Sequence, residues 1–80
     1  MNTEYFASTI NSILDDGGKQ VPRWVLIKAS GCETQGGDLS ELACILIKWQ
    51  KAGWIRVLVN LENAEDQDPV VEILGYVRWR

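Results

Sequence analysis

Two long stretches of the chain place apolar residues at the spacing of an amphipathic α-helix. The first runs from Thr3 to Asp16, and the positions between its apolar residues are mostly polar. Gly17 and Gly18 follow at once, and glycine readily adopts the left-handed conformation that ends a helix. The pattern therefore predicts a helix over Thr3–Asp16 that buries one face. The apolar residues of that face are Phe6, Ile10, Ile13 and Leu14.

The second helical stretch opens with an acidic form of the capping box, because Asp38 stands three residues before Glu41. Gly53 marks its end. Ile45 and Ile47 widen its apolar face beyond what a single core contact requires. We therefore expect a helix over Asp38–Ala52 that is either central to the fold or shared with a partner. The main apolar stripe consists of Leu39, Leu42, Ala43, Leu46 and Trp49.

Two later stretches alternate apolar and polar residues, which is typical of half-buried β-strands. They cover Trp54–Leu61 and Val70–Trp79. The segment between them, Glu62–Pro69, carries four acidic residues and no apolar residue larger than alanine. Two alternating runs around a polar loop predict an antiparallel hairpin.

The register of this hairpin is an open choice, since a long loop does not fix how two strands align. One alignment places Leu61 opposite Val71. In that alignment Trp54 faces Arg78 across the two strands, which would permit a cation–π contact on the outer face of the hairpin.

The segment Val21–Ser30 permits two interpretations. Trp24-Val25-Leu26-Ile27 is a short apolar run with two β-branched residues, as in a strand, whereas Pro22 suits the first position of a helix and Gly31 suits the position after its end. A helix gives a domain of helices plus a C-terminal antiparallel hairpin, which we favour, and a strand gives the alternative, a three-stranded antiparallel sheet with two helices on one face. Both are α+β folds, and 80 residues provide one core, so we expect a single domain over residues 1–80.

The order helix, short element, capped helix and hairpin resembles the winged-helix superfamily. The resemblance covers Val21–Trp79, and its specific part is the helix end that runs into the wing as Trp49-Gln50-Lys51-Ala52-Gly53-Trp54-Ile55. In that superfamily the helix before the wing commonly presents its N-terminal residues to bases in the major groove. The resemblance places Asp38, Ser40, Glu41 and Cys44 there, and places Glu62, Glu65, Asp66 and Asp68 at the wing tip.

The charge of the chain favours a protein partner over nucleic acid. Eight Lys and Arg residues against eleven Asp and Glu residues give a net charge of -3. The start of the second helix and the wing tip are both acidic, whereas DNA binding requires cations there. DNA binding would need the basic residues to cluster on one surface. The basic residues that would have to form this cluster are Lys48, Lys51, Arg56, Arg78 and Arg80.

The sequence also bears on location. No apolar run approaches the roughly 20 residues that span a bilayer, and the first residues do not combine a basic segment with an apolar one. Two cysteines are few for a disulfide scaffold, and so we expect reduced thiols in a cytoplasmic protein that does not bind membranes.

Catalysis and metal binding are not expected. The chain has no histidine, the commonest general base and metal ligand, and Cys32 and Cys44 supply only two of the four ligands of zinc, so they are expected to be buried or half-buried structural residues. The segment Asp15–Lys19 is a helix end rather than a phosphate loop. The acidic loop lacks the calcium-loop pattern, and we predict no cofactor. A less favoured alternative is a small enzyme or ligand carrier with a pocket lined by residues such as Tyr5, Tyr76 and Cys44.

The four tryptophans divide by position. Trp49 and Trp79 fall on apolar faces and suit a core, whereas Trp24 and Trp54 are candidates for an exposed surface. Tryptophan and arginine are enriched at the energetic centres of interfaces, although arginine stems also cover aromatic rings within one molecule. We expect a non-catalytic protein-interaction or regulatory module, able to form a homodimer, with a DNA-binding transcriptional regulator as the alternative. The predicted partner-binding residues are Trp24, Trp54, Arg23, Arg56, Arg78, Ile45 and Ile47.

Overall fold

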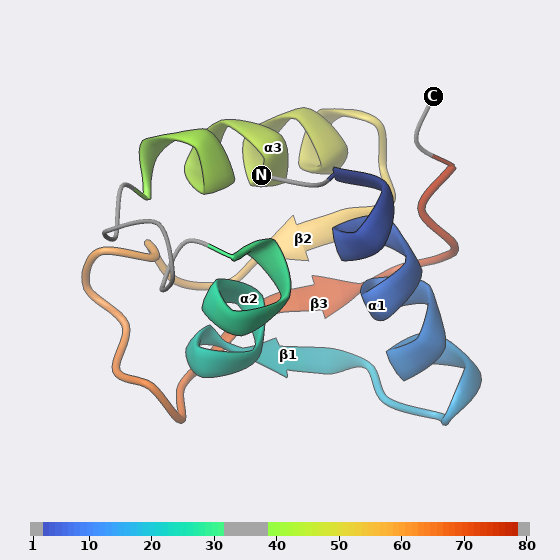
Figure 1. Cartoon of the computed structure of the whole chain (residues 1–80), viewed down its shortest axis with the longest axis horizontal. Helices are drawn as coiled ribbons and strands as arrows, with labels where there is room; N and C mark the ends of the chain where they lie inside the picture. The colour runs from blue at the N-terminus through green and yellow to red at the C-terminus, as the bar shows by residue number, and fades with distance from the viewer. Residues whose placement is uncertain (1–2, 32–38, 79–80) are drawn as a thin grey trace.

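The chain folds as a small α+β domain of three helices and a three-stranded antiparallel sheet, which confirms the predicted fold class (Figure 1). The computed structural model describes residues 3–31 and 39–78. In chain order the elements are α1 (Thr3–Asp15), β1 (Gln20–Pro22), α2 (Arg23–Ser30), α3 (Ser40–Lys51), β2 (Ile55–Val57) and β3 (Pro69–Ile73).

The last strand in sequence, β3, lies in the middle of the sheet, which has the order β1-β3-β2. Both of its neighbours run antiparallel to it, and so the predicted C-terminal hairpin is present as β2–β3. The register between β1 and β3 shifts at Pro22, which ends the short strand. Proline suits this edge position because it has no backbone N–H to donate. In Figure 1, α3 lies alongside β2, and α1 lies beside α2.

The ambiguous segment contains both elements in succession. β1 ends at Pro22, and α2 begins at Arg23, so Trp24–Ala29 is helical. Proline therefore precedes the helix instead of occupying its first position. Gly31 follows the helix with φ 78°, and its N–H donates to the carbonyls of Ile27 and Lys28, as expected for a glycine that ends a helix.

The two predicted amphipathic helices are present. α1 has the expected bounds to within one residue, and Gly17 follows it with φ 88°. α3 begins at Ser40, and the residue before it, Leu39, makes no side-chain cap. The predicted N-cap, Asp38, lies outside the described residues. The other end agrees with the prediction, because Gly53 has φ 84°.

The strands are shorter than predicted and align differently. β2 covers only Ile55–Val57, because the chain turns away from the sheet after Leu58, whose N–H donates to the Val70 carbonyl over 2.7 Å. The hairpin pairs Val57 with Val71, so the suggested register is wrong by four residues. An even shift keeps the same faces buried, which is why alternation alone could not exclude it.

The end of the second predicted strand is also shorter, because β3 stops at Ile73. Val77 is still buried, and the Asn11 side chain of α1 holds its backbone: the Asn11 amide donates to the Val77 carbonyl over 3.1 Å, and the Val77 N–H donates to Asn11 Oδ1 over 2.7 Å. A side chain of a helix thus replaces the missing strand partner. Trp79 lies outside the described residues.

The core gathers around Trp49, which is buried as predicted. Its indole stacks on Phe6 of α1 with ring centroids 5.2 Å apart, and its other neighbour is Trp54 at 6.4 Å in an edge-on arrangement. Such aromatic pairs stabilise a core by about 1 kcal/mol beyond the burial of their area. The helix α3 is therefore central to the fold, and most of its wide apolar stripe packs inside the molecule.

Candidate protein-interaction site

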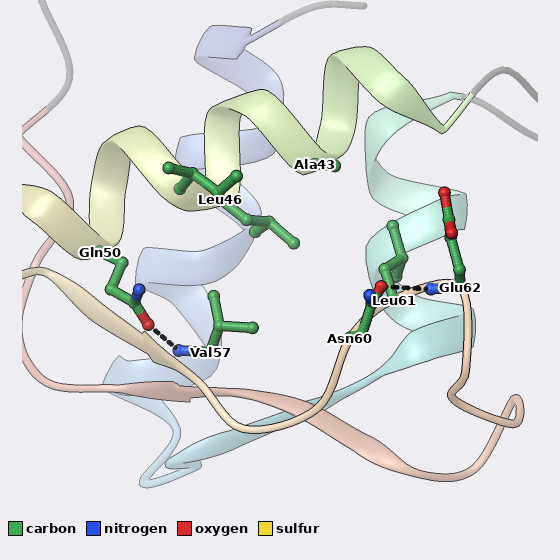
Figure 2. Close-up of a pocket in the computed structure, with 8 residues that line it drawn as sticks. Ala43, Leu46, Gln50, Val57, Asn60, Leu61 and Glu62 are labelled. Carbon is green, nitrogen blue, oxygen red and sulfur yellow. Dashed lines mark hydrogen bonds between the residues drawn. The ribbon is translucent and has the colours of Figure 1, made fainter.

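An open pocket of about 520 Å³ lies between α3 and the connection that follows β2 (Figure 2). On the helix side it is lined by Ala43, Leu46, Ile47 and Gln50. Ile47 is the most unusual of these residues, because its large apolar side chain is 51% exposed. We call this pocket the α3 groove.

The opposite wall of the α3 groove comes from Val57 of β2 and from the segment Asn60–Glu62. The Leu61 side chain is buried even though its residue belongs to no strand, so this part of the connection is packed against the core. Apolar side chains form the floor, and three polar residues, Gln50, Asn60 and Glu62, join them in the lining. This mixture is typical of sites that bind a ligand in one orientation.

The connection after β2 is held in place by Arg23 at the start of α2. The guanidinium donates through Nε to the Leu61 carbonyl over 3.3 Å and through Nη1 to Asp66 Oδ1 over 2.8 Å. The backbone N–H groups of Arg23 and Trp24 donate to the carbonyls of Asp68 and Asp66 at 3.0 and 3.1 Å. These contacts satisfy two donors that the first turn of α2 leaves free. Arg23 thus positions one wall of the groove from within the molecule.

The two amide side chains of the groove have a fixed orientation. Gln50 Oε1 accepts the Val57 N–H over 2.8 Å, and Asn60 Oδ1 accepts the Glu62 N–H over 3.0 Å, as the dashed lines of Figure 2 show. Because both oxygens accept backbone hydrogens, the NH2 group of each side chain remains as a donor. Neither NH2 group has a hydrogen bond within the part of the chain that the structure describes.

A second, smaller cleft of about 160 Å³ lies between α1 and α2. Trp24 is exposed there, as predicted, and Tyr5 and Lys28 line the same cleft. This cleft shares no residue with the α3 groove. The predicted partner-binding residues Trp24 and Ile47 therefore belong to two separate depressions of the surface.

The other predicted partner-binding residues divide into exposed and packed groups. Trp54 is half-buried, because its ring packs against Trp49. It is therefore not the free surface group that the sequence suggested. Arg56 and Arg78 are exposed, and Arg56 forms an ion pair with Glu72 at 3.1 Å. Ile45 is half-buried against the core.

The suggested contact between Trp54 and Arg78 is absent, because the register instead brings Leu74 to Trp54. The Leu74 N–H donates to the Trp54 carbonyl over 2.9 Å. Residue 78 lies four positions farther along the chain, well past the end of β3.

Outside the two pockets we considered the cysteines, clusters of metal-ligating side chains and Tyr76. Cys44 is exposed on α3, which corrects the expectation of a buried thiol, and Cys32 lies outside the described residues. Within residues 3–31 and 39–78, no three Cys, Asp or Glu side chains lie close enough together to hold a metal ion. The exposed Tyr76 donates its hydroxyl to Asp15, and this hydrogen bond, with the negative charge of Asp15, raises the pKa of Tyr76 above its usual value.

Sequence reasoning identified Ile47 but missed Gln50, Asn60 and Leu61, which line the α3 groove only because the chain leaves the sheet after β2. The Asn60 turn was the one local signal, since asparagine side chains often accept from the backbone two residues later.

No helix in the described ranges is long and apolar enough to cross a bilayer. Comparison of the chain with protein-family models, with curated proteins and with solved structures gives no match.

Proposed function

We propose that the chain is a non-catalytic protein-interaction module that binds a segment of a partner protein in the α3 groove. The observation that carries this proposal is the groove itself: an open pocket whose lining includes the exposed Ile47 and two amide side chains of fixed orientation. Apolar side chains that line a pocket beside a few polar groups of fixed orientation are typical of ligand-binding sites.

The arrangement of elements also supports a winged-helix-like module. α3 precedes the β2–β3 hairpin, and it enters β2 through Gly53, in the order that the sequence resemblance implies. In that superfamily the helix before the wing commonly contacts the bound molecule. The α3 groove lies between these two elements, since it is lined by α3 and by the connection from β2 toward β3.

The test is selection of short displayed peptides against the purified chain. We expect bound peptides to lose at least about tenfold in affinity on Ile47→Asp, which places a charge in the groove lining without disturbing the core. Leu74→Asp is the matched control, because Leu74 is 55% exposed and lies outside the groove lining. Equal binding by wild type and Ile47→Asp would overturn the proposal.

Self-association through α3 is tested separately, with the same Ile47→Asp variant. Leu42, Leu46 and Trp49 are buried within the chain, so Ile47 is the large apolar residue of α3 that remains exposed for a second copy. A stable dimer buries roughly 800 Å² on each partner, which is much more than one side chain provides. Sedimentation equilibrium of wild type and Ile47→Asp separates a homodimer from a module that requires another protein.

A further inference from the structure

We infer that the α3 groove is selective for a positively charged partner segment: a peptide that inserts an apolar side chain beside Ile47 and pairs a lysine or arginine with Glu62. This inference rests on the proposed function and adds the chemical class of the partner. It follows from the charges of the groove lining and of the connection that forms one of its walls.

Glu62 is the single ionisable residue among those that line the α3 groove. It is exposed, and its carboxylate forms no hydrogen bond or ion pair with another residue in the described ranges. The residue itself is held in place, since its N–H donates to Asn60 Oδ1. A free carboxylate on a fixed backbone at the rim of an apolar pocket suits a cation on the bound segment.

Two other acidic residues of the same connection are already used. Asp66 pairs with Arg23, and Asp68 Oδ2 accepts the Glu65 N–H over 2.9 Å. Lys48 and Lys51 are exposed on α3 but are not part of the groove lining. Glu62 is therefore the one charged side chain in the groove lining itself.

The free donors of the α3 groove suit a peptide in particular. The NH2 groups of Gln50 and Asn60 stand on opposite sides of the pocket, one on α3 and one on the connection (Figure 2). Backbone carbonyls of a bound segment can accept from both. An apolar side chain then occupies the floor next to Leu46 and Val57.

The experiment uses two displayed libraries of short peptides with the same random apolar positions. The remaining positions are lysine or arginine in the first library and aspartate or glutamate in the second. We expect wild type to enrich binders from the basic library. Glu62→Gln should weaken these binders about three- to fivefold, the value of one exposed ion pair, and Glu62→Lys about tenfold.

Glu65→Lys is the matched control, because it makes the same charge change in the same connection, outside the groove lining. It should leave the affinity within about twofold of wild type, since an exposed charge away from the contact is screened by salt. Equal losses in Glu62→Lys and Glu65→Lys would show that only the overall charge matters and would overturn the inference.

The remaining outcomes separate this inference from the proposed function. If Ile47→Asp abolishes binding while Glu62→Lys leaves it unchanged, the groove binds peptides without charge preference, and the inference fails alone. Enrichment from the acidic library overturns it as well. If Ile47→Asp has no effect, both proposals fail. A dimer that forms in wild type and is lost in Ile47→Asp would identify a second copy, not a basic partner, as the occupant.

Discussion

Among single residues, Arg23 joins α2 to two points of the connection that follows β2. Its side chain starts on α2 and ends on Leu61 and Asp66, and so it fixes the connection that forms one wall of the α3 groove. The side chain of Arg23 is 23% exposed, whereas that of Asp66 is 72% exposed. Water therefore screens the ion pair, and the contact with the Leu61 carbonyl carries the larger share of the stabilisation.

Replacement of Arg23 by methionine, which keeps most of the aliphatic stem, is expected to lower the free energy of unfolding by about 1 kcal/mol. Urea denaturation measures this change. Arg56→Met is the matched control, because Arg56 forms an ion pair on the surface of the hairpin with no carbonyl contact, and its loss should be below about 0.5 kcal/mol. Equal losses in the two variants would contradict the assigned role of Arg23.

Tyr76 makes stability depend on pH in the alkaline range. The hydrogen bond to Asp15 raises the pKa of Tyr76 in the folded chain above the ordinary value of 10.0. The stabilisation that Tyr76 contributes is therefore fully present below pH 10 and is lost as the pH rises through the higher pKa of the folded state. The chain should unfold more readily in urea above pH 10, and Tyr76→Phe should reduce that loss.

The pKa of Tyr76 can be measured directly in Tyr5→Phe, which leaves one tyrosine in the chain, by absorbance of the phenolate. Adding Asp15→Asn to this variant should bring the pKa down toward its ordinary value, because the negative acceptor is gone. An unchanged titration curve would contradict the role assigned to Asp15.

At the scale of elements, the turn from α3 into β2 depends on a left-handed residue. Gly53 has φ 84°, and no atom lies within 4 Å of the position that a Cβ would occupy. Gly53→Ala should therefore cost about 1 kcal/mol of stability through backbone strain alone. Gly75→Ala is the control: the site is equally open and its φ is not positive, so thermal unfolding should show no loss of stability. A similar loss in both variants would refute the strain argument.

The ends of the helices could be predicted from the sequence because they depend on neighbouring residues. Gly17, Gly31 and Gly53 each end a helix by their own conformation. The lengths of the strands could not be predicted, because they depend on distant residues. Leu61 continues the alternating pattern of β2, yet it is buried in a turn that Arg23 stabilises from α2.

The candidate site likewise combines one residue that a local pattern identifies with others that it does not. Ile47 could be identified in the sequence, because it lies beyond the apolar stripe of its own helix. Gln50, Asn60 and Glu62 look like ordinary polar surface residues in the sequence. They form a site only because the chain leaves the sheet after Leu58 and returns to the side of α3. Such a return is set by tertiary contacts, which a local pattern does not contain.

For the molecule as a whole, the negative net charge lies on a compact domain. The radius of gyration is 11.3 Å, close to the value of about 11.6 Å expected for a compact domain of this length. One core joins all three helices and the sheet, so the net charge of -3 is spread over a small surface. Polyanions would be repelled by this field at long range.

We therefore expect no mobility shift of duplex DNA, even at low salt where non-specific binding is strongest. The charges near α3 and the hairpin are unfavourable as well, because Glu41 is exposed in the first turn of α3, and Glu62 and Glu65 are exposed on the connection after β2. A winged-helix regulator of DNA would bring cations to these positions. The triple variant Glu41→Lys, Glu62→Lys, Glu65→Lys serves as the control: it makes the same surfaces basic and should produce a shift that disappears as salt rises. A salt-sensitive shift with the wild-type chain would contradict this expectation.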